Sequence, residues 1–292
     1  MGSILNNSGV IPEFHYQIPW RATSVHPGYH RSSQSGGGYE FQGHAPLISY
    51  SDPRKLDLHV SLHDPLGQYV VRTFRQRTTI PVYVIADLSA SMGFQGVVRK
   101  IELLASFTTT TAYSAYRTGD PFGLFACGDG ILWDLCLPLG WYKGRVEEVV
   151  YQRLSKHYPS GSSFLSLQRI AEHLVRKRAL LFLVSDFHFA LTEISQILDS
   201  LSFHDVVPVV LWDKMEYLKL PRWGLARMSD PETGQERSLF MRPGLHDSFA
   251  AAFEERCRNL IQLCIQHGRE PFFLEGNFNP DDMTQYFFSL NL

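Results

Sequence analysis

The stretch IPVYVIADLSASMGFQG, residues 80–96, joins an apolar run to an abrupt polar end. A continuous apolar run of this kind is typical of a strand that is buried on both faces of a parallel sheet. The run ends at Asp87, and Ser89 and Ser91 follow at a spacing of two. Alternate side chains of an extended segment point to the same side, so the carboxylate and both hydroxyls can converge if the loop stays extended after the strand. The stretch therefore predicts a buried strand with a polar site at its end.

The segments that follow alternate between helical and strand patterns. Apolar residues recur at helical spacing over residues 101–115. FGLFAC (122–127) and ILWDLCL (131–137) flank a GDG turn and predict a β-hairpin. ALLFLVSD (179–186) is a second buried strand that ends in a carboxylate, Asp186. Such alternation predicts an α/β fold, a doubly wound and mostly parallel sheet of the Rossmann-like kind.

Three segments are expected along the chain. Residues 1–37 are rich in Gly, Ser, Pro and His and are predicted to form a flexible N-terminal arm. Residues 38–78 contain short extended pieces and are predicted to form a β-rich extension. Residues 79–292 carry the α/β pattern and are predicted to form the main domain.

Composition excludes several classes of partner. The 292 residues are 44% hydrophobic and 19% charged, with a net charge of −2, which is typical of a globular protein. This balance offers no electrostatic basis for binding nucleic acid. No apolar run approaches the roughly 18 residues that cross a bilayer, and the first residues lack a leader pattern. We therefore expect a cytoplasmic protein that does not insert into membranes. Its four cysteines do not form metal-binding or disulfide patterns, so we expect free thiols.

The polar strand ends predict a metal site. In doubly wound folds, ligands bind beyond the carboxyl ends of the strands, near the point where the strand order reverses. PSGSSFL (159–165) adds a hydroxyl from Ser163 or its neighbour Ser162 at the start of a helix. Carboxylates and hydroxyls form an all-oxygen set, which suits Mg²⁺ or a similar divalent cation such as Mn²⁺. The predicted metal ligands are Asp87, Ser89, Ser91, Ser163 and Asp186.

Structural roles remain as alternatives for two of these residues. Asp87 alone can cap the turn after its strand, and Ser163 can cap a helix N-terminus, where serine is favoured. The partial positive charge of a helix N-terminus also disfavours a nearby cation, so the carboxylates must outweigh it. His188 follows Asp186 by two residues and is expected to be a surface loop residue rather than a ligand.

These motifs carry a family resemblance. Asp-x-Ser-x-Ser at Asp87, a later Gly-x-Ser and an Asp that closes a hydrophobic strand are similar to the metal-ion-dependent adhesion site of von Willebrand factor A domains. Over residues 38–290 the chain resembles the MoxR-associated von Willebrand factor A-like proteins, a domain of unknown function. An upstream motif of that branch reads RKLDL here, with Leu58 in place of Trp. The ordered motifs are VIADLSASMGF (84–94), RTGDPFGLFAC (117–127), LLFLVSDF (180–187) and SDPETG (229–234).

The resemblance implies a binding module. In the wider family, the serines and the loop-two hydroxyl contact Mg²⁺, the aspartates often act through water, and a partner's carboxylate completes the shell. The loop-two residue is usually Thr, and here Ser163 supplies the same oxygen. The branch is linked to MoxR-type AAA+ ATPases that act as chaperones or maturation factors for a client protein. One soluble member type of similar length belongs to the methanol dehydrogenase gene cluster.

Two other functions compete with a non-enzymatic binding module. A metal-dependent phosphohydrolase would use the same cation, because Mg²⁺ also serves phosphoryl transfer. Against it, Ser89 stands two residues after Asp87, where a phosphatase of the haloacid-dehalogenase kind needs an aspartate. The sequence also contains no Gly-x-Ser-x-Gly or His-Glu-x-x-His motif. The third hypothesis is a scaffold whose metal site stays unoccupied.

Overall fold

The computed structural model of the chain describes residues 12–24, 26–49, 52–94, 96, 98–142, 146–212, 223–229 and 236–289. Contacts divide the chain into two compact units. Unit 1 comprises Met1–Tyr16 and Pro81–Leu292, and unit 2 comprises Gln17–Ile80. The start of unit 1's main segment is close to residue 79, the predicted start of the main domain.

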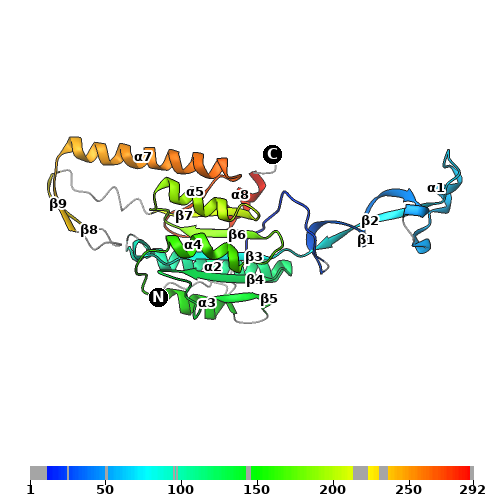
Figure 1. Cartoon of the computed structure of the whole chain (residues 1–292), viewed down its shortest axis with the longest axis horizontal. Coiled ribbons are helices and arrows are strands. Elements are labelled where there is room, and N and C mark those ends of the chain that lie inside the picture. Colours follow the sequence, from blue (N-terminus) through cyan, green and yellow to red (C-terminus); the bar gives the residue numbers. More distant parts are fainter. Residues whose placement is uncertain are drawn as a thin grey trace. The chain divides into compact units, whose positions relative to one another are not determined.

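Unit 1 contains a six-stranded sheet with the order β10-β7-β6-β3-β4-β5 (Figure 1). All neighbouring pairs are parallel except β4 and β5, which are antiparallel. The predicted α/β class with a mostly parallel sheet is therefore confirmed. In chain order the strands are β3 (Val82–Asp87), β4 (Phe122–Cys127), β5 (Leu137–Gly140), β6 (Leu180–Ser185), β7 (Asp205–Leu211) and β10 (Phe272–Leu274).

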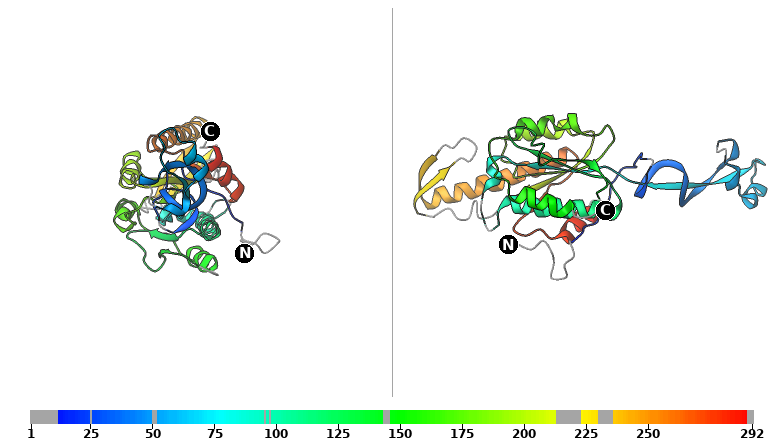
Figure 2. Two further views of the ribbon diagram at one scale, coloured as in Figure 1. Left: turned by 90° about the vertical axis from the view of Figure 1, so that its right-hand side faces the viewer. Right: turned by 90° about the horizontal axis from the view of Figure 1, so that it is seen from below.

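Helices cover both faces of this sheet (Figure 2). Every residue of β3, β4 and β6 is buried, which explains why these strands read as continuous apolar runs. Ile85 and Leu183 face a cluster with α4 (Phe164–Arg169), α5 (Leu191–Ser200) and α7 (Pro243–Gln266). On the opposite face, the Phe182 ring lies 5.5 Å from Phe107 of α2 and 6.1 Å from Phe287 of α8. Here α2 is Lys100–Thr118 and α8 is Pro280–Ser289, while α3 (Val146–Ser155) packs beside α2.

The sheet places β3 at its topological switch point. From β3 the chain crosses through α2 to β4 on one side, whereas from β6 it crosses through α5 to β7 on the other. The neighbouring strands β3 and β6 therefore send their following loops in opposite directions. Asp87 ends β3, and Asp186 comes directly after β6. The architecture thus brings the two predicted carboxylates to the position where α/β folds bind ligands.

A short N-terminal segment belongs to the core of unit 1. The Phe14 side chain is 1% exposed, and its ring lies 5.9 Å from Phe182. The Tyr16 hydroxyl donates a hydrogen bond to Asp120 Oδ2 at 2.6 Å. Burial, and then the negative charge of Asp120, raise the pKa of Tyr16 well above its usual value. Residues 12–16 thus pack in unit 1, although they lie within the predicted arm, residues 1–37; residues 1–11 lie outside the described part.

Unit 2 is built on an antiparallel pair, β1 (Pro27–Pro46) and β2 (Val70–Thr78). Strand β1 begins inside the predicted arm, eleven residues before the predicted β-rich extension at residue 38. Between the two strands lie the 3₁₀ turns Leu47–Ser49 and Pro53–Lys55 and helix α1 (Leu58–Leu62). Asp57 caps α1 and accepts a hydrogen bond from Arg72 Nε at 2.7 Å. That bond is the largest cause of the lowered pKa of Asp57.

The hairpin after β4 differs from the prediction. Its second strand, β5, begins at Leu137 rather than at residue 131. Ile131 forms a single bridge to Cys127, and the chain then turns, with Leu135 N–H donating to the Leu132 carbonyl at 2.9 Å. The Leu132 N–H still donates to the Ala126 carbonyl of β4 at 2.8 Å, but the N–H groups of Leu135 and Cys136 donate within the turn, so the ladder is interrupted before Leu137.

Other described features bear on the remaining predictions. All four cysteines are free thiols, as predicted, and Cys127 and Cys264 are buried. Within the described ranges, no helix is both long and apolar enough to span a membrane. The antiparallel strands β8 (Gly224–Ser229) and β9 (Glu236–Met241) flank the SDPETG motif, of which only Ser229 is described.

Candidate functional site

Asp87 lies at the centre of a buried network of hydrogen bonds. Its side chain is fully buried at the end of β3. Oδ1 accepts from the Ser89 N–H at 2.8 Å and from Ser163 Oγ at 2.6 Å, and Oδ2 accepts from Ser185 Oγ at 2.5 Å. Burial raises the pKa of Asp87, and the nearby charge of Asp186 raises it further, while the hydrogen bonds oppose that shift. The carboxylate thus caps the turn that follows it and also accepts hydrogen bonds from hydroxyls of two other segments.

The remaining predicted residues join the same network. Ser89 Oγ and Ser91 Oγ are hydrogen-bonded at 3.1 Å, and Ser91 also hydrogen-bonds the Asp186 side chain. The structure therefore brings together all five residues singled out from the sequence. None of their side chains is more than 7% exposed. Taking carboxylates out of water is costly unless they are paired, so this enclosure demands compensation within the site.

Of the two candidate serines, Ser163 is the one that lies in the buried network. Ser163 is fully buried and donates to Asp87, whereas the Ser162 side chain is exposed. Ser163 also occupies the N-cap position of α4, but its side chain makes no capping hydrogen bond. The hydroxyl is thus committed to the carboxylate rather than to the helix terminus.

A tight turn before α4 positions Ser163. Gly161 has φ +69°, a left-handed conformation that favours glycine. A Cβ at Gly161 would lie 1.8 Å from Asp129 Oδ1. The same oxygen accepts a hydrogen bond from the Ser162 N–H at 2.9 Å, and the Ala90 N–H donates to the Gly161 carbonyl at 2.9 Å. The loops after β3 and β4 therefore hold this turn close to Asp87.

The loop that carries Asp186 is strained and firmly anchored. Phe187 has φ +49°, and no other non-glycine residue in the described ranges has a positive φ. Trp212 Nε1 donates to the Asp186 carbonyl at 2.7 Å. Arg256 Nη2 donates to the Phe187 carbonyl at 2.9 Å and also to the Phe189 carbonyl. These contacts hold the backbone in a conformation that it would otherwise avoid.

Sequence reasoning missed Lys100, which pairs with Asp186 inside the site. Its side chain is 2% exposed, and Nζ donates to Asp186 Oδ2 at 2.8 Å. The ammonium also lies 5.6 Å from the centroid of the Phe94 ring. Burial raises the pKa of Asp186, but the charges of His188 and Lys100 outweigh it and the net pKa lies below its usual value. The sequence signal was slight, since a single lysine at the start of a helical pattern does not reveal that its side chain is buried.

Two further residues lie beside the network. Ser185 precedes Asp186 and donates to Asp87; its signal was a hydroxyl inside an otherwise apolar strand end. His188 Nε2 lies 3.9 Å from Asp186 Oδ2, and its side chain is 36% exposed. It is an exposed loop residue, as predicted, and its ring reaches toward the carboxylate.

The donor set fits a hard cation better than a soft one. The described residues contain no group of three or more His, Cys, Asp or Glu side chains that could hold a metal. A metal here would therefore rely on serine hydroxyls together with two carboxylates, which suits Mg²⁺ rather than zinc. Ser163 donates its hydrogen to Asp87 and so keeps its lone pairs for a cation. The ammonium of Lys100 already pairs with Asp186, so a metal here would share that carboxylate with a positive charge of the chain itself.

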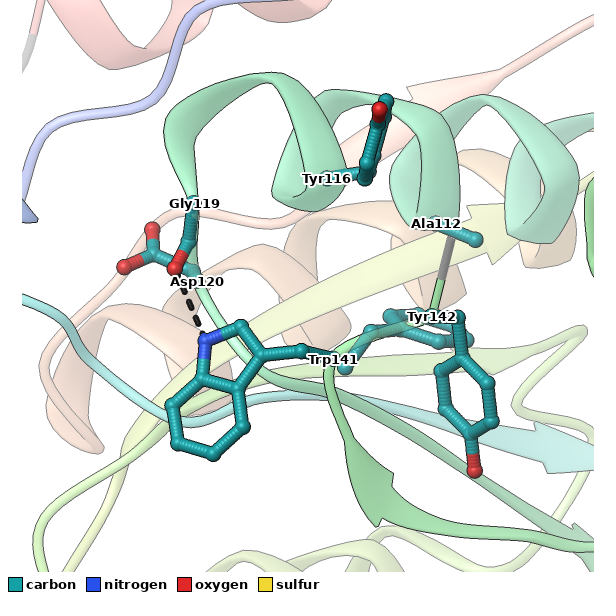
Figure 3. Close-up of a pocket in the computed structure, with 7 residues that line it drawn as sticks. Ala112, Tyr116, Gly119, Asp120, Trp141 and Tyr142 are labelled. Atoms are coloured by element: carbon teal, nitrogen blue, oxygen red, sulfur yellow. Dashed lines mark hydrogen bonds between the residues drawn. The ribbon is translucent and has the colours of Figure 1, made fainter. Parts of the chain in front are cut away.

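A separate cavity lies near the amino end of β4 (Figure 3). Its volume is about 150 Å³, and Tyr116, Trp141 and Tyr142 form much of its wall. Trp141 Nε1 donates to the Gly119 carbonyl at 3.0 Å. Because Asp87 stands at the carboxyl end of the adjacent parallel strand, this cavity belongs to the opposite edge of the sheet. It takes no part in the polar network.

Comparison with known proteins identifies the family. Residues 52–258 match the family described as "Protein of unknown function DUF58". The chain belongs to the DUF58 family. This membership agrees with the domain of unknown function that the sequence motifs predicted.

One curated relative and two solved structures are similar to this chain. A Paracoccus denitrificans protein described as an "uncharacterized protein in moxR 3'region" is 32% identical over 102 residues, 35% of this chain and 97% of the relative. The conserved hypothetical protein BatB from Bacteroides thetaiotaomicron has a TM-score of 0.42 and 11% identity, over 73% of this chain and 98% of that one. An aerotolerance-related membrane protein from Bacteroides fragilis has a TM-score of 0.40 and 11% identity, over 72% and 97%. At these TM-scores the two structures carry no conclusion about fold or function.

Proposed function

We propose that this DUF58 protein is a Mg²⁺-dependent protein-interaction module that works with a MoxR-type AAA+ ATPase in the maturation of another protein. The observation that carries the proposal is the buried network at the topological switch point. There, Asp87 and Asp186 converge with the hydroxyls of Ser89, Ser91 and Ser163. An interaction site of the von Willebrand factor A kind has the same residue types at the same strand ends.

Each residue has a definite role in this proposal. The three serines provide neutral hydroxyl oxygens, and the two aspartates provide negative charge. Asp87 also orients Ser163 by accepting its hydrogen. A bound Mg²⁺ or Mn²⁺ would supply a Lewis-acidic position that a carboxylate of the client protein can occupy. No covalent step is required of the chain, so the proposed role is binding rather than catalysis.

The partner is proposed from the curated relative. Its description places that protein in the 3' region of moxR, and it is 32% identical to this chain over 102 residues. Proteins encoded side by side often act together, which supports an ATPase of the MoxR type as the partner. Methanol dehydrogenase is one candidate client, because a similar member type belongs to its gene cluster.

Binding of a purified MoxR-type ATPase from the same organism tests the proposal. We expect binding in Mg²⁺ and at least a tenfold loss with Asp87→Asn, which keeps the side-chain shape and removes the charge. Asp134→Asn is the matched control, because the Asp134 side chain is exposed. The variants matter more than EDTA here, since chelation also affects an ATPase directly. Equal affinities for the wild-type protein and Asp87→Asn would rule the proposal out.

One observation favours a second candidate, a scaffold that uses the site without a metal. Lys100 already pairs with Asp186 at 2.8 Å and so partly balances the carboxylates. In that case ATPase binding would survive both Mg²⁺ removal and Asp87→Asn. Isothermal titration calorimetry of the isolated protein with MgCl₂ separates the two candidates. A scaffold that binds no metal gives no binding heat in this titration.

A further inference from the structure

Lys100 is an unusual residue at an unusual position. Lysine is almost never fully buried unless it is paired, and this side chain is 2% exposed. It is also the first residue of α2, where the helix dipole disfavours a positive charge. The pairing with Asp186 permits the burial, so the local rule that is broken here is the one on charge at a helix start. Such conflicts are expected where a residue serves a function.

The surroundings of the ammonium explain what it does. On one side Nζ contacts Asp186 Oδ2 at 2.8 Å, and on another it lies 5.6 Å from the Phe94 ring centroid. Asp186 in turn contacts Ser91, and its charge raises the pKa of Asp87. The lysine therefore pairs with one member of the carboxylate pair that the proposed metal would use.

We propose that the Lys100 ammonium is a tethered counter-cation that competes with a divalent cation for Asp186. This inference rests on the proposed function and specifies how its metal site is regulated. Leaving aside the exposed His188 ring, which is common to all the states compared, two carboxylates and one ammonium give the site a single net negative charge. A divalent ion then gives a net positive charge, whereas without the lysine the same ion would give neutrality. Like charges repel strongly in a buried site, so Lys100 weakens metal binding.

The competition also has a consequence for the partner. When Mg²⁺ displaces the Lys100 ammonium from Asp186, the ammonium still lies beside the site, so one positive charge remains there and one carboxylate from a client protein can balance it. Metal binding and client binding would then support each other, since each favours the charge state that the other needs. Without a client, the Lys100 ammonium stays paired with Asp186 and opposes metal binding.

Titration with MgCl₂ at constant ionic strength tests the competition. We expect Lys100→Met to bind Mg²⁺ at least about tenfold more tightly than the wild-type protein, since a tenfold change corresponds to about 1.4 kcal/mol. Arg99→Met is the matched control. It removes one positive charge from the preceding residue, which pairs with the partly exposed Glu102 instead of the site. We expect this control to bind Mg²⁺ with wild-type affinity.

The outcomes separate the inference from the proposed function. Equal affinity for the wild-type protein and Lys100→Met would refute the competition and leave a Mg²⁺-dependent module intact. Binding by neither protein would refute both. Mg²⁺ binding by Lys100→Met but not by the wild-type protein would support the competition, because the ammonium would then exclude the ion completely. If Lys100→Met does not fold, Lys100→Gln takes its place, because it keeps a hydrogen-bond donor without the charge.

Chemical labelling of the wild-type protein gives an independent measurement. Reductive methylation followed by mass spectrometry reports whether Lys100 Nζ is accessible. We expect protection without Mg²⁺ and increased labelling at saturating Mg²⁺, when the ion replaces the ammonium at Asp186. Continued protection of Lys100 at saturating Mg²⁺ would contradict the displacement.

Discussion

Replacing Ser163 with alanine tests the hydrogen bond that joins the loop before α4 to Asp87. The bond is 2.6 Å long and fully buried, and its acceptor is a carboxylate. Hydrogen bonds to charged groups contribute roughly 1.5–3 kcal/mol to stability. Ser163→Ala should therefore lower the free energy of unfolding by about 2 kcal/mol. In a chain of this size that corresponds to a fall in melting temperature of roughly 4–8 °C.

Ser162→Ala is the matched control, because it makes the same chemical change one residue away on an exposed side chain. A surface change of this kind should alter stability by no more than about 0.5 kcal/mol. Thermal unfolding followed by circular dichroism, in EDTA and in MgCl₂, measures both variants. Ser163→Ala should also lose any stabilisation by Mg²⁺, and Ser162→Ala should keep it. Equal melting temperatures for the two variants, or a larger effect at Ser162, would refute the reasoning.

Two further predictions concern the loops around the site. Arg256→Met removes a charged donor from the carbonyls of Phe187 and Phe189 and should cost roughly 1.5–3 kcal/mol. Hydrogen exchange in the loop after β6 should then become faster, and an unchanged rate would count against this anchor; Arg258→Met, on an exposed side chain, serves as control. Gly161→Ala places a Cβ at positive φ, which costs about 1 kcal/mol or more. Urea unfolding measures that loss, and unchanged stability would show that the turn adapts freely.

Much of the fold could be predicted because its strongest signals are local. The apolar runs before Asp87 and Asp186 are strands buried on both faces, and burial removes the need for alternating polar residues. The hairpin after β4 was less predictable. Apolar residues occupy both strands and turns there, and the turn that delays β5 to Leu137 depends on backbone hydrogen bonds that composition does not reveal. The boundary at residue 37 was similarly uncertain, because glycine and serine do not prevent a strand from forming when a partner such as β2 is available.

The sequence by itself determined that one carboxylate and two hydroxyls follow within five residues at the end of β3. The predicted extended segment is wrong, because Ser91 lies in the 3₁₀ turn Ala90–Gly93 and the Ser89 N–H donates back to Asp87 Oδ1. Only the tertiary structure decided the rest. It selected Ser163 over Ser162, across 76 residues, and brought Lys100 to Asp186 across 86 residues. The physical reason is that such pairs depend on which strands become neighbours and where each loop turns back, and neither is encoded in the spacing of a single motif.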